Sequence, residues 1–261
     1  MSIQSRAELV AAKRLVVKVG SSSITGSNEN QLDALVAALA KAHARGTEVI
    51  LVSSGAIATG MPLAGFETKP EDLPTSQALA AIGQSRLIAR YQASLEKFHI
   101  VAAQVLLTSG DLEVDETREN AARAMERLLS LRVLPIVNEN DTVATQEIRF
   151  GDNDRLAALV AVLVQADALV LLSDVDALYD MPPTLPGASR IDNVAFGQSL
   201  DHVKVDGAGS GVGTGGAVTK LGAAQLATEA GVAVLLTSAK NVAAALDDAS
   251  VGTFFEAAPS S

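Results

Sequence analysis

The chain has no cysteine and no tryptophan, and aromatic residues make up only 3% of its 261 residues. Without cysteine there are no disulfides, no thiolate nucleophile and no cysteine-based metal site. The scarcity of aromatic rings leaves few surfaces on which single-stranded nucleic acid could stack. The composition therefore excludes a disulfide-rich scaffold and argues against a nucleic-acid partner.

Basic residues and histidines are also few. Lysine and arginine number 20 against 30 aspartates and glutamates, which gives a net charge of −10. A protein that binds the phosphate backbone needs a basic patch, and we find none in the sequence. There are three histidines, His43, His99 and His202. None is near another, and none has an acidic or serine partner at a known catalytic spacing. Binding of an anion must then depend on individual lysines.

Long apolar runs are absent. No run approaches the ~18 residues that span a membrane, and the first residues, "MSIQSRAELVAAKR", contain no signal-peptide core. We therefore expect a cytoplasmic protein with no membrane partner. Hydrophobic residues nevertheless make up 48% of the chain, so it is a packed globular protein, long enough for one large α/β domain or two small ones.

Short apolar runs alternate with segments whose apolar residues recur at helical spacing. Strands are expected at residues 14–20, 48–55, 100–107, 133–138, 167–174 and 232–238. Helices are expected at residues 30–46, 75–98, 116–131, 153–166 and 216–231. Apolar strands separated by helices are typical of parallel βαβ units. We predict an α/β fold, a three-layer α/β/α sandwich with a mainly parallel central sheet, as a single domain over residues 1–261.

Residues 179–216 break this alternation. The segment is rich in proline and glycine, and we interpret it as hairpins followed by a flexible glycine loop. Its last part, "DGAGSGVGTGGAVTK", leads into a helix that carries Lys220 and resembles a phosphate cradle followed by a positive charge. It is not a Walker A sequence, and its G-x-G-x-x-G match lacks the preceding strand of a dinucleotide site. A disordered loop is the alternative.

Polar residues lie within or at the ends of three of the predicted strands. In "VKVGSSS", Lys18 lies within an apolar strand, where a charge is costly unless it meets an anion; a lysine reaching water from an edge strand is the alternative. In "VSSGAIATG", Ser54 opens a short helix, either as part of an anion site or as a plain N-cap. In "LLSDVDALYD", Ser173 and Asp174 end a strand, at a ligand site or in a turn.

A fourth strand ends in "PIVNENDTV", and "FGDNDR" follows within one loop. Asparagine and aspartate favour turns for backbone reasons, so a solvated turn is one interpretation. The other is a small-molecule site at the carboxyl end of a parallel strand.

Together these stretches resemble a known family. "VVKVGSSSIT", "VSSGAIATG", "IVNENDTVA", "FGDNDRLAALVA", "LLSDVDALYD" and "GSGVGTGGAVTK" occur in the order found in glutamate 5-kinases of the amino acid kinase superfamily, over residues 14–256. The resemblance implies ATP-dependent phosphorylation of the side-chain carboxylate of L-glutamate to L-glutamyl 5-phosphate, the first step of proline biosynthesis. Many members also carry a C-terminal PUA domain, which we do not find in this sequence.

The resemblance also implies site residues. Residues 14–166 would bind glutamate and residues 167–256 would bind ATP, with Mg²⁺ held mainly by the ATP phosphates rather than by the protein. The catalytic residues would be Lys18, Lys220 and Asp154, with Asp154 orienting the two lysines. The glutamate-binding residues would be Ser54, Asp141 and Asn153, with Asp141 pairing with the α-ammonium group. The ATP-binding residues would be Lys18, Ser173, Asp174, Thr214, Gly215, Gly216, Ala217, Val218, Thr219 and Lys220.

The resemblance further implies a homo-oligomer, dimer or tetramer, and feedback inhibition by L-proline. Two departures from the family pattern occur: Ala217 stands where methionine is common, and "MPPTLPGASR" stands where many members have "DPR" after "LYD". Two other functions stay open. One is a related kinase that phosphorylates acetylglutamate, carbamate or UMP, and the other is an amino-acid-binding regulatory module without turnover.

Overall fold

A computed structural model describes residues 3–143, 153–200, 203, 216–247 and 251–259. One eight-stranded sheet forms its centre, in the order β3-β4-β2-β1-β5-β9-β10-β8. The strands of this sheet are β1 (Arg14–Val19), β2 (Glu48–Ser53), β3 (Ala102–Leu107), β4 (Leu134–Glu139), β5 (Ala168–Ser173), β8 (Asn193–Val194), β9 (Ala233–Ser238) and β10 (Thr253–Phe255). Two short strands, β6 (Leu178–Tyr179) and β7 (Arg190–Ile191), form a separate antiparallel hairpin.

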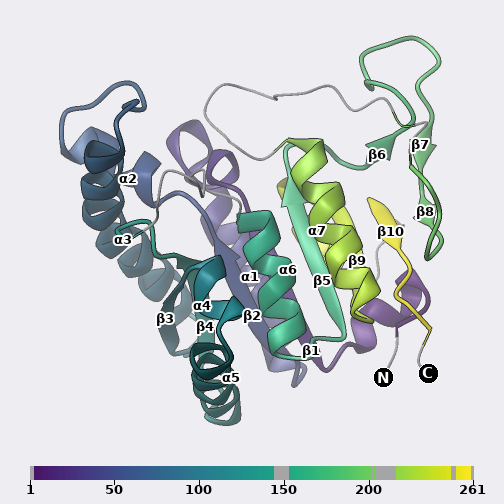
Figure 1. Ribbon diagram of the computed structural model, residues 1–261, viewed down its shortest axis with the longest axis horizontal. Coiled ribbons are helices and arrows are strands. Elements are labelled where there is room, and N and C mark those ends of the chain that lie inside the picture. The colour runs from purple at the N-terminus through teal and green to yellow at the C-terminus, as the bar shows by residue number, and fades with distance from the viewer. Residues whose placement is uncertain (1–2, 144–152, 201–202, 204–215, 248–250, 260–261) are drawn as a thin grey trace.

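Helices cover both faces of the sheet, so the predicted three-layer α/β/α sandwich is confirmed (Figure 1). The helices are α1 (Gln31–Ala44), α2 (Ala56–Leu63), α3 (Leu73–Glu96), α4 (Ser109–Glu113), α5 (Asp115–Ser130), α6 (Asn153–Leu163), α7 (Ala217–Glu229) and α8 (Val242–Asp247). Helices α6 and α7 lie in front of the sheet in Figure 1 and α1 lies behind it. Within the described ranges, no helix is long and apolar enough to cross a membrane.

The strands that pair from β3 to β9 are all parallel, as the apolar runs predicted. Strand β10 is antiparallel to β9, and the sequence did not predict it. It contains only Thr253–Phe255 and therefore offers no periodic pattern. The hairpin within the expected irregular segment is present, whereas the glycine loop after it lies outside the described residues.

Alternation along β1 decides which face each side chain joins. Leu15, Val17 and Val19 pack into the core on the side of α1 and α3. Val16 packs into the opposite core, together with side chains of α5, α6 and α7. Because side chains two residues apart in a strand share a face, Lys18 also lies on the side of α6 and α7. Strand β1 thus directs its one buried lysine toward the start of these two helices.

Helices α2 and α3 approach each other so closely that two glycines are required between them. A Cβ atom at Gly83 would lie 1.8 Å from the carbonyl oxygen of Ala56, and one at Gly60 would lie 2.0 Å from that of Leu79. Real Cβ atoms do not approach backbone atoms so closely, and neither backbone can move without moving its helix. The position of α3 relative to α2, and thus to the end of β2, is therefore fixed by direct contact of the two backbones.

We expect Gly83→Ala to lower the free energy of unfolding by at least about 2 kcal/mol, because overpacking here displaces backbone rather than a flexible side chain. The matched control is Gly222→Ala in α7, where an added Cβ would meet no atom within 4 Å. There the substitution should raise stability slightly, since alanine is the better helix former. Urea denaturation of both variants checks the prediction, and equal effects would contradict it.

Candidate active site

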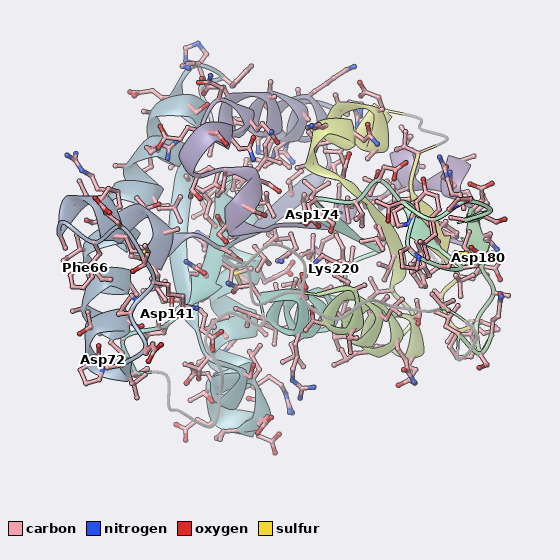
Figure 2. All side chains as sticks on the ribbon, turned by 90° about the horizontal axis from the view of Figure 1, so that it is seen from above. Phe66, Asp72, Asp141, Asp174, Asp180 and Lys220 are labelled. Atoms are coloured by element: carbon pink, nitrogen blue, oxygen red, sulfur yellow. The ribbon has the colours of Figure 1, made fainter. Side chains whose placement is uncertain are left out.

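Polar side chains gather at one edge of the sheet. The carboxyl ends of β1, β2, β4 and β5 meet there, because these four strands are parallel and adjacent. The backbone N–H of Ser54 donates to the carbonyl of Val19, 3.1 Å away, and so holds the ends of β1 and β2 together. Helices α6 and α7 begin at this edge. In Figure 2 Lys220 and Asp174 lie near the centre of the molecule and Asp141 lies toward α2 and α3.

Two buried lysines share one buried carboxylate. Lys18 Nζ lies 2.5 Å from Asp154 Oδ1, and Lys220 Nζ lies 3.2 Å from Asp154 Oδ2. All three side chains are at least nine-tenths buried. Lys18 comes from a central strand, so the alternative of an edge-strand lysine reaching water is wrong. The three groups carry a formal charge of +1 in sum, which leaves the cluster attractive to an anion.

The charge of Asp154 is maintained by its neighbours. Burial alone would raise the pKa of this carboxyl group, but the ammonium groups of Lys18 and Lys220 and hydrogen bonds from Lys18 and Thr219 lower it below its ordinary value. Asp154 is therefore ionised at neutral pH. Its carboxylate reduces the repulsion between two ammonium groups that must both approach a phosphate.

The residues expected to bind ATP are only partly described. Gly216 is the N-cap of α7, and Ala217, Val218 and Thr219 form its first turn, with Val218 exposed. The hydroxyl of Thr219 lies 2.9 Å from Asp154 Oδ2 and 2.8 Å from the carbonyl oxygen of Gly216, and can donate to either. The expected contacts of Thr214 and Gly215 lie outside the described residues.

At the end of β5, Ser173 is buried and its hydroxyl donates to Asp174 Oδ1 over 3.0 Å. Asp174 itself is exposed at the same edge of the sheet as Lys18. The pair is therefore placed next to the lysine cluster, on the strand that adjoins β1. Its role in nucleotide binding stays a prediction.

A chain of side-chain amides lies beside the lysine cluster. Asn153 Nδ2 donates to Ser54 Oγ over 2.9 Å and to Asn138 Oδ1 over 3.3 Å. Asn138 Nδ2 donates in turn to Gln84 Oε1 over 2.8 Å. Ser54 is not the N-cap of α2, which is Gly55, so the plain N-cap interpretation is wrong. Since Asn153 precedes Asp154 directly, the amide chain and the lysine cluster meet at the start of α6.

The side-chain oxygen Oδ1 of Asn153 is buried and accepts no hydrogen bond from the residues that the structure describes. A buried acceptor without a donor is costly, and such atoms in folded proteins call for an explanation. A ligand that donates a hydrogen bond at this place would provide one. Sequence reasoning assigned a role to Asn153, noticed Asn138 only as part of the polar stretch that ends β4, and missed Gln84, because an amide within a helix carries no sign of its partner.

Asp141 follows β4 and is buried, with 9% of its surface exposed. Burial raises the pKa of its carboxyl group to about 6, although the nearby Lys69 acts in the opposite direction. A cation bound next to this carboxylate would stabilise its ionised form, which burial disfavours. The α-ammonium group of an amino acid is a cation of suitable size, in agreement with the expected role of Asp141.

We expect Asp141→Asn to stabilise the protein at neutral pH. The pKa is about 6 in the folded state against 3.8 as the ordinary value, so ionisation of Asp141 destabilises the fold increasingly as the pH rises from the ordinary pKa to the folded pKa. The gain in unfolding free energy should be roughly 1–3 kcal/mol above this range and absent below about pH 4. Thermal melts of both proteins from pH 4 to 8 test this, and a variant less stable than wild type at pH 7.5 would contradict it.

Comparison of this chain with known protein families identifies its family. A model of the amino acid kinase family matches residues 13–238. A glutamate 5-kinase from Clavibacter sepedonicus is 66% identical over 255 residues, which are 98% of this chain and 98% of that protein. The chain belongs to the amino acid kinase family, among the glutamate 5-kinases.

Further comparisons agree with this assignment. A glutamate 5-kinase from Leifsonia xyli subsp. xyli (strain CTCB07) is 59% identical over 256 residues, covering 98% of this chain and 95% of that protein. Among solved structures, carbamate kinase from Giardia lamblia bound to AMP-PNP has a TM-score of 0.69 and covers 95% of this chain and 100% of its own. At 16% identity this second likeness concerns the fold alone.

In this amino acid kinase, the segment "MPPTLPGASR" forms a loop whose two ends are joined by hydrogen bonds. The N–H of Asp180 donates to the carbonyl of Ser189, 3.1 Å away, and the N–H of Ser189 donates to Asp180 Oδ1, 2.8 Å away. Figure 2 places Asp180 on the far side of the molecule from Asp141, well away from Lys220. Asp180, at the base of this segment, is therefore not part of the lysine cluster.

Proposed function

We propose that this amino acid kinase transfers the γ-phosphoryl group of ATP to the side-chain carboxylate of L-glutamate and so produces L-glutamyl 5-phosphate, the first step of proline biosynthesis. The observation that supports it most is the buried pair of Lys18 and Lys220 on Asp154, adjacent to the amide of Asn153. The relatives, named glutamate 5-kinases, support the choice of acceptor.

The reaction needs charge neutralisation more than a base. A carboxylate is already ionised at pH 7, so its oxygen can attack the γ-phosphorus directly. A new carboxyl O–P bond forms while the bond between the γ-phosphorus and the bridging oxygen breaks, and ADP leaves with that oxygen. Two anions must approach each other closely, and the ammonium groups of Lys18 and Lys220 would neutralise the phosphoryl oxygens between them.

Asp154 has a positioning role in this proposal. It contacts both lysines, and its pKa is held low, so it stays ionised during the reaction. Its two oxygens hold the two ammonium groups in a fixed arrangement before ATP arrives. Preorganisation of this kind lowers the barrier because the two ammonium groups do not have to be reoriented during phosphoryl transfer.

Glutamate would lie on the side of β2 and β4. Asp141 would pair with its α-ammonium group, and Ser54 and Asn153 would fix its orientation by hydrogen bonds. Its side-chain carboxylate would then extend toward the lysine cluster. In this proposal residues 14–166 bind glutamate, mainly through Asp141 and Ser54, and residues 167–256 bind ATP through Lys220, while Lys18 contacts ATP from the first part.

The residues present fit a nucleotide whose Mg²⁺ is held by phosphate oxygens and water, as is usual for Mg²⁺ with ATP. No group of three or more histidine, aspartate or glutamate side chains that could hold a metal occurs in the described part of the chain. Lys18 and Lys220 instead offer donors for phosphate oxygens. When bound, Mg²⁺ would reduce the negative charge of the phosphates and orient them.

Three further parts of the proposal come from the resemblance to the family. The protein would be a cytoplasmic homo-oligomer, dimer or tetramer, and L-proline would inhibit it by feedback. Light scattering would measure the oligomeric state. Glutamate-dependent turnover at several proline concentrations would measure the inhibition.

Trapping of the acyl phosphate tests the proposed function. The protein is incubated with ATP, Mg²⁺, L-glutamate and hydroxylamine, and glutamyl hydroxamate is measured. We expect formation of hydroxamate that depends on both ATP and L-glutamate. If a folded protein that binds ATP forms none, the acceptor is wrong, and acetylglutamate, carbamate and UMP are tested next. Binding of glutamate without any turnover would instead indicate a regulatory module.

A further inference from the structure

Helix α3 makes two hydrogen bonds to residues that adjoin the proposed glutamate site. Gln84 accepts the hydrogen bond from Asn138, and Tyr91, two helical turns further on, shares a hydrogen bond of 2.9 Å with Ser53. The hydroxyl of Ser53 donates its proton to the carbonyl of Ser54 over 3.1 Å, so Tyr91 is the donor to Ser53. Neither Gln84 nor Tyr91 belongs to the lysine cluster. Each is connected through one intervening residue to a residue expected to bind the substrate: Gln84 through Asn138 to Asn153, and Tyr91 through Ser53 to Ser54.

The amide of Asn138 can adopt only one orientation in this network. Its Oδ1 accepts from the backbone N–H of Glu139 over 2.9 Å and from Asn153 Nδ2, and its Nδ2 donates to Gln84 Oε1. A rotation of the amide by half a turn would bring Nδ2 against two other donors. Gln84 Oε1 is thus the acceptor that makes the observed orientation favourable at both ends of the amide.

The orientation of Asn138 sets that of Asn153. Because Asn138 and Ser54 both offer oxygens to Asn153 Nδ2, the other end of this amide, Oδ1, has no donor among the described residues. Free L-glutamate at neutral pH has a single donor group, its α-ammonium group, and its other polar atoms are carboxylate oxygens. An outward oxygen at Asn153 accepts from the ammonium group, whereas an outward nitrogen would not.

We propose that Gln84 is a positioning residue for the amino-acid substrate, acting through Asn138 to keep the carbonyl oxygen of Asn153 available to the α-ammonium group. The inference rests on the proposed function. The neighbouring residue, Gly83, is in backbone contact with α2. This contact fixes the position of Gln84 along α3 relative to the end of β4. The helix therefore selects for the ammonium group although it does not touch the substrate.

The variant that tests this is Gln84→Met, which keeps the size and helix propensity of glutamine and removes the acceptor. The matched control is Gln92→Met, on an exposed position of the same helix. For Gln84→Met we expect the KM for L-glutamate to rise roughly tenfold, with kcat and the KM for ATP within about twofold of wild type. The Gln92→Met variant should match wild type. Gln84→Glu, which restores an oxygen acceptor, should recover most of the loss.

A double-mutant cycle separates positioning from a merely structural effect. If Gln84 acts through Asn153, then Gln84→Met should change kcat/KM for L-glutamate by less than about twofold when Asn153→Ala is already present. An effect that persists at full size in that background would overturn the proposal, as would an unchanged KM in the single variant. The slope at low glutamate concentration gives kcat/KM without saturation, and thermal melts verify that each variant is folded.

The failure of this inference is distinct from the failure of the proposed function. Wild-type protein that forms no hydroxamate refutes the proposed function, and the Kd for L-glutamate from calorimetry then takes the place of KM in the same cycle. Active wild-type protein with an unaffected Gln84→Met variant refutes the role of Gln84 alone.

Discussion

Replacement of Lys220 by alanine should lower kcat for glutamyl hydroxamate formation roughly 10²–10³-fold, the usual loss when one preorganised donor is removed from a developing anionic charge. The side chain is buried, and its Nζ lies 3.2 Å from Oδ2 of Asp154. The other oxygen keeps its contact with Lys18, so the carboxylate stays paired in the variant. We therefore expect the fold to be retained while turnover is lost.

The control for this prediction is Lys240→Ala, which removes an exposed lysine and should leave kcat unchanged. Thermal melts in the absence of nucleotide compare the stability of the two variants. If Lys220→Ala kept more than about a tenth of wild-type kcat, the assignment of Lys220 to the transferring phosphoryl group would be wrong.

Asp154→Asn should produce the largest loss of stability in the site. Removal of the charge leaves two buried ammonium groups without their shared carboxylate, and breaking a buried pair in this way costs about 3–5 kcal/mol. Turnover should fall as well, because the lysines are no longer held together. Urea denaturation at pH 7 measures the first effect and hydroxamate formation measures the second.

Asp247→Asn is a matched control for this substitution. Asp247 also contacts two cations, Lys41 at 2.5 Å and Arg45 at 3.1 Å, but on the surface. Exposed ion pairs are screened by solvent, so this variant should lose less than about 1 kcal/mol. Equal losses in the two variants would show that burial of the Asp154 cluster has no energetic consequence.

The pH dependence of the difference follows from the lowered pKa of Asp154. A carboxyl group whose pKa is lower in the folded state stabilises the fold above its unfolded pKa and loses that contribution as the pH falls through the folded value. The stability difference between wild type and Asp154→Asn should therefore be constant from pH 6 to 8 and diminish below about pH 4. Inorganic phosphate should also raise the Tm of the variant more than that of wild type, because the cluster has gained one positive charge.

The sequence alone determined the layers of the fold and the family. The buried strands were mostly apolar runs, and the long helices had apolar residues at helical spacing, because a parallel sheet covered on both sides requires such patterns. Lys18 could be singled out because a lysine in an apolar strand is costly. The short strand β10 could not, since three residues carry no periodicity.

Only the tertiary structure decided how the site residues are combined. Lys18, Asp154 and Lys220 lie on three separate elements, and their contacts depend on the order in which β1, α6 and α7 pack. Gln84 gave no indication of a function in the sequence, and Asn138 stood out only as part of a polar stretch, because an amide in a helix or strand is ordinary until its partner is known. Hydrogen bonds between side chains far apart in the chain are set by packing, and packing is a property of the folded molecule rather than of any single segment.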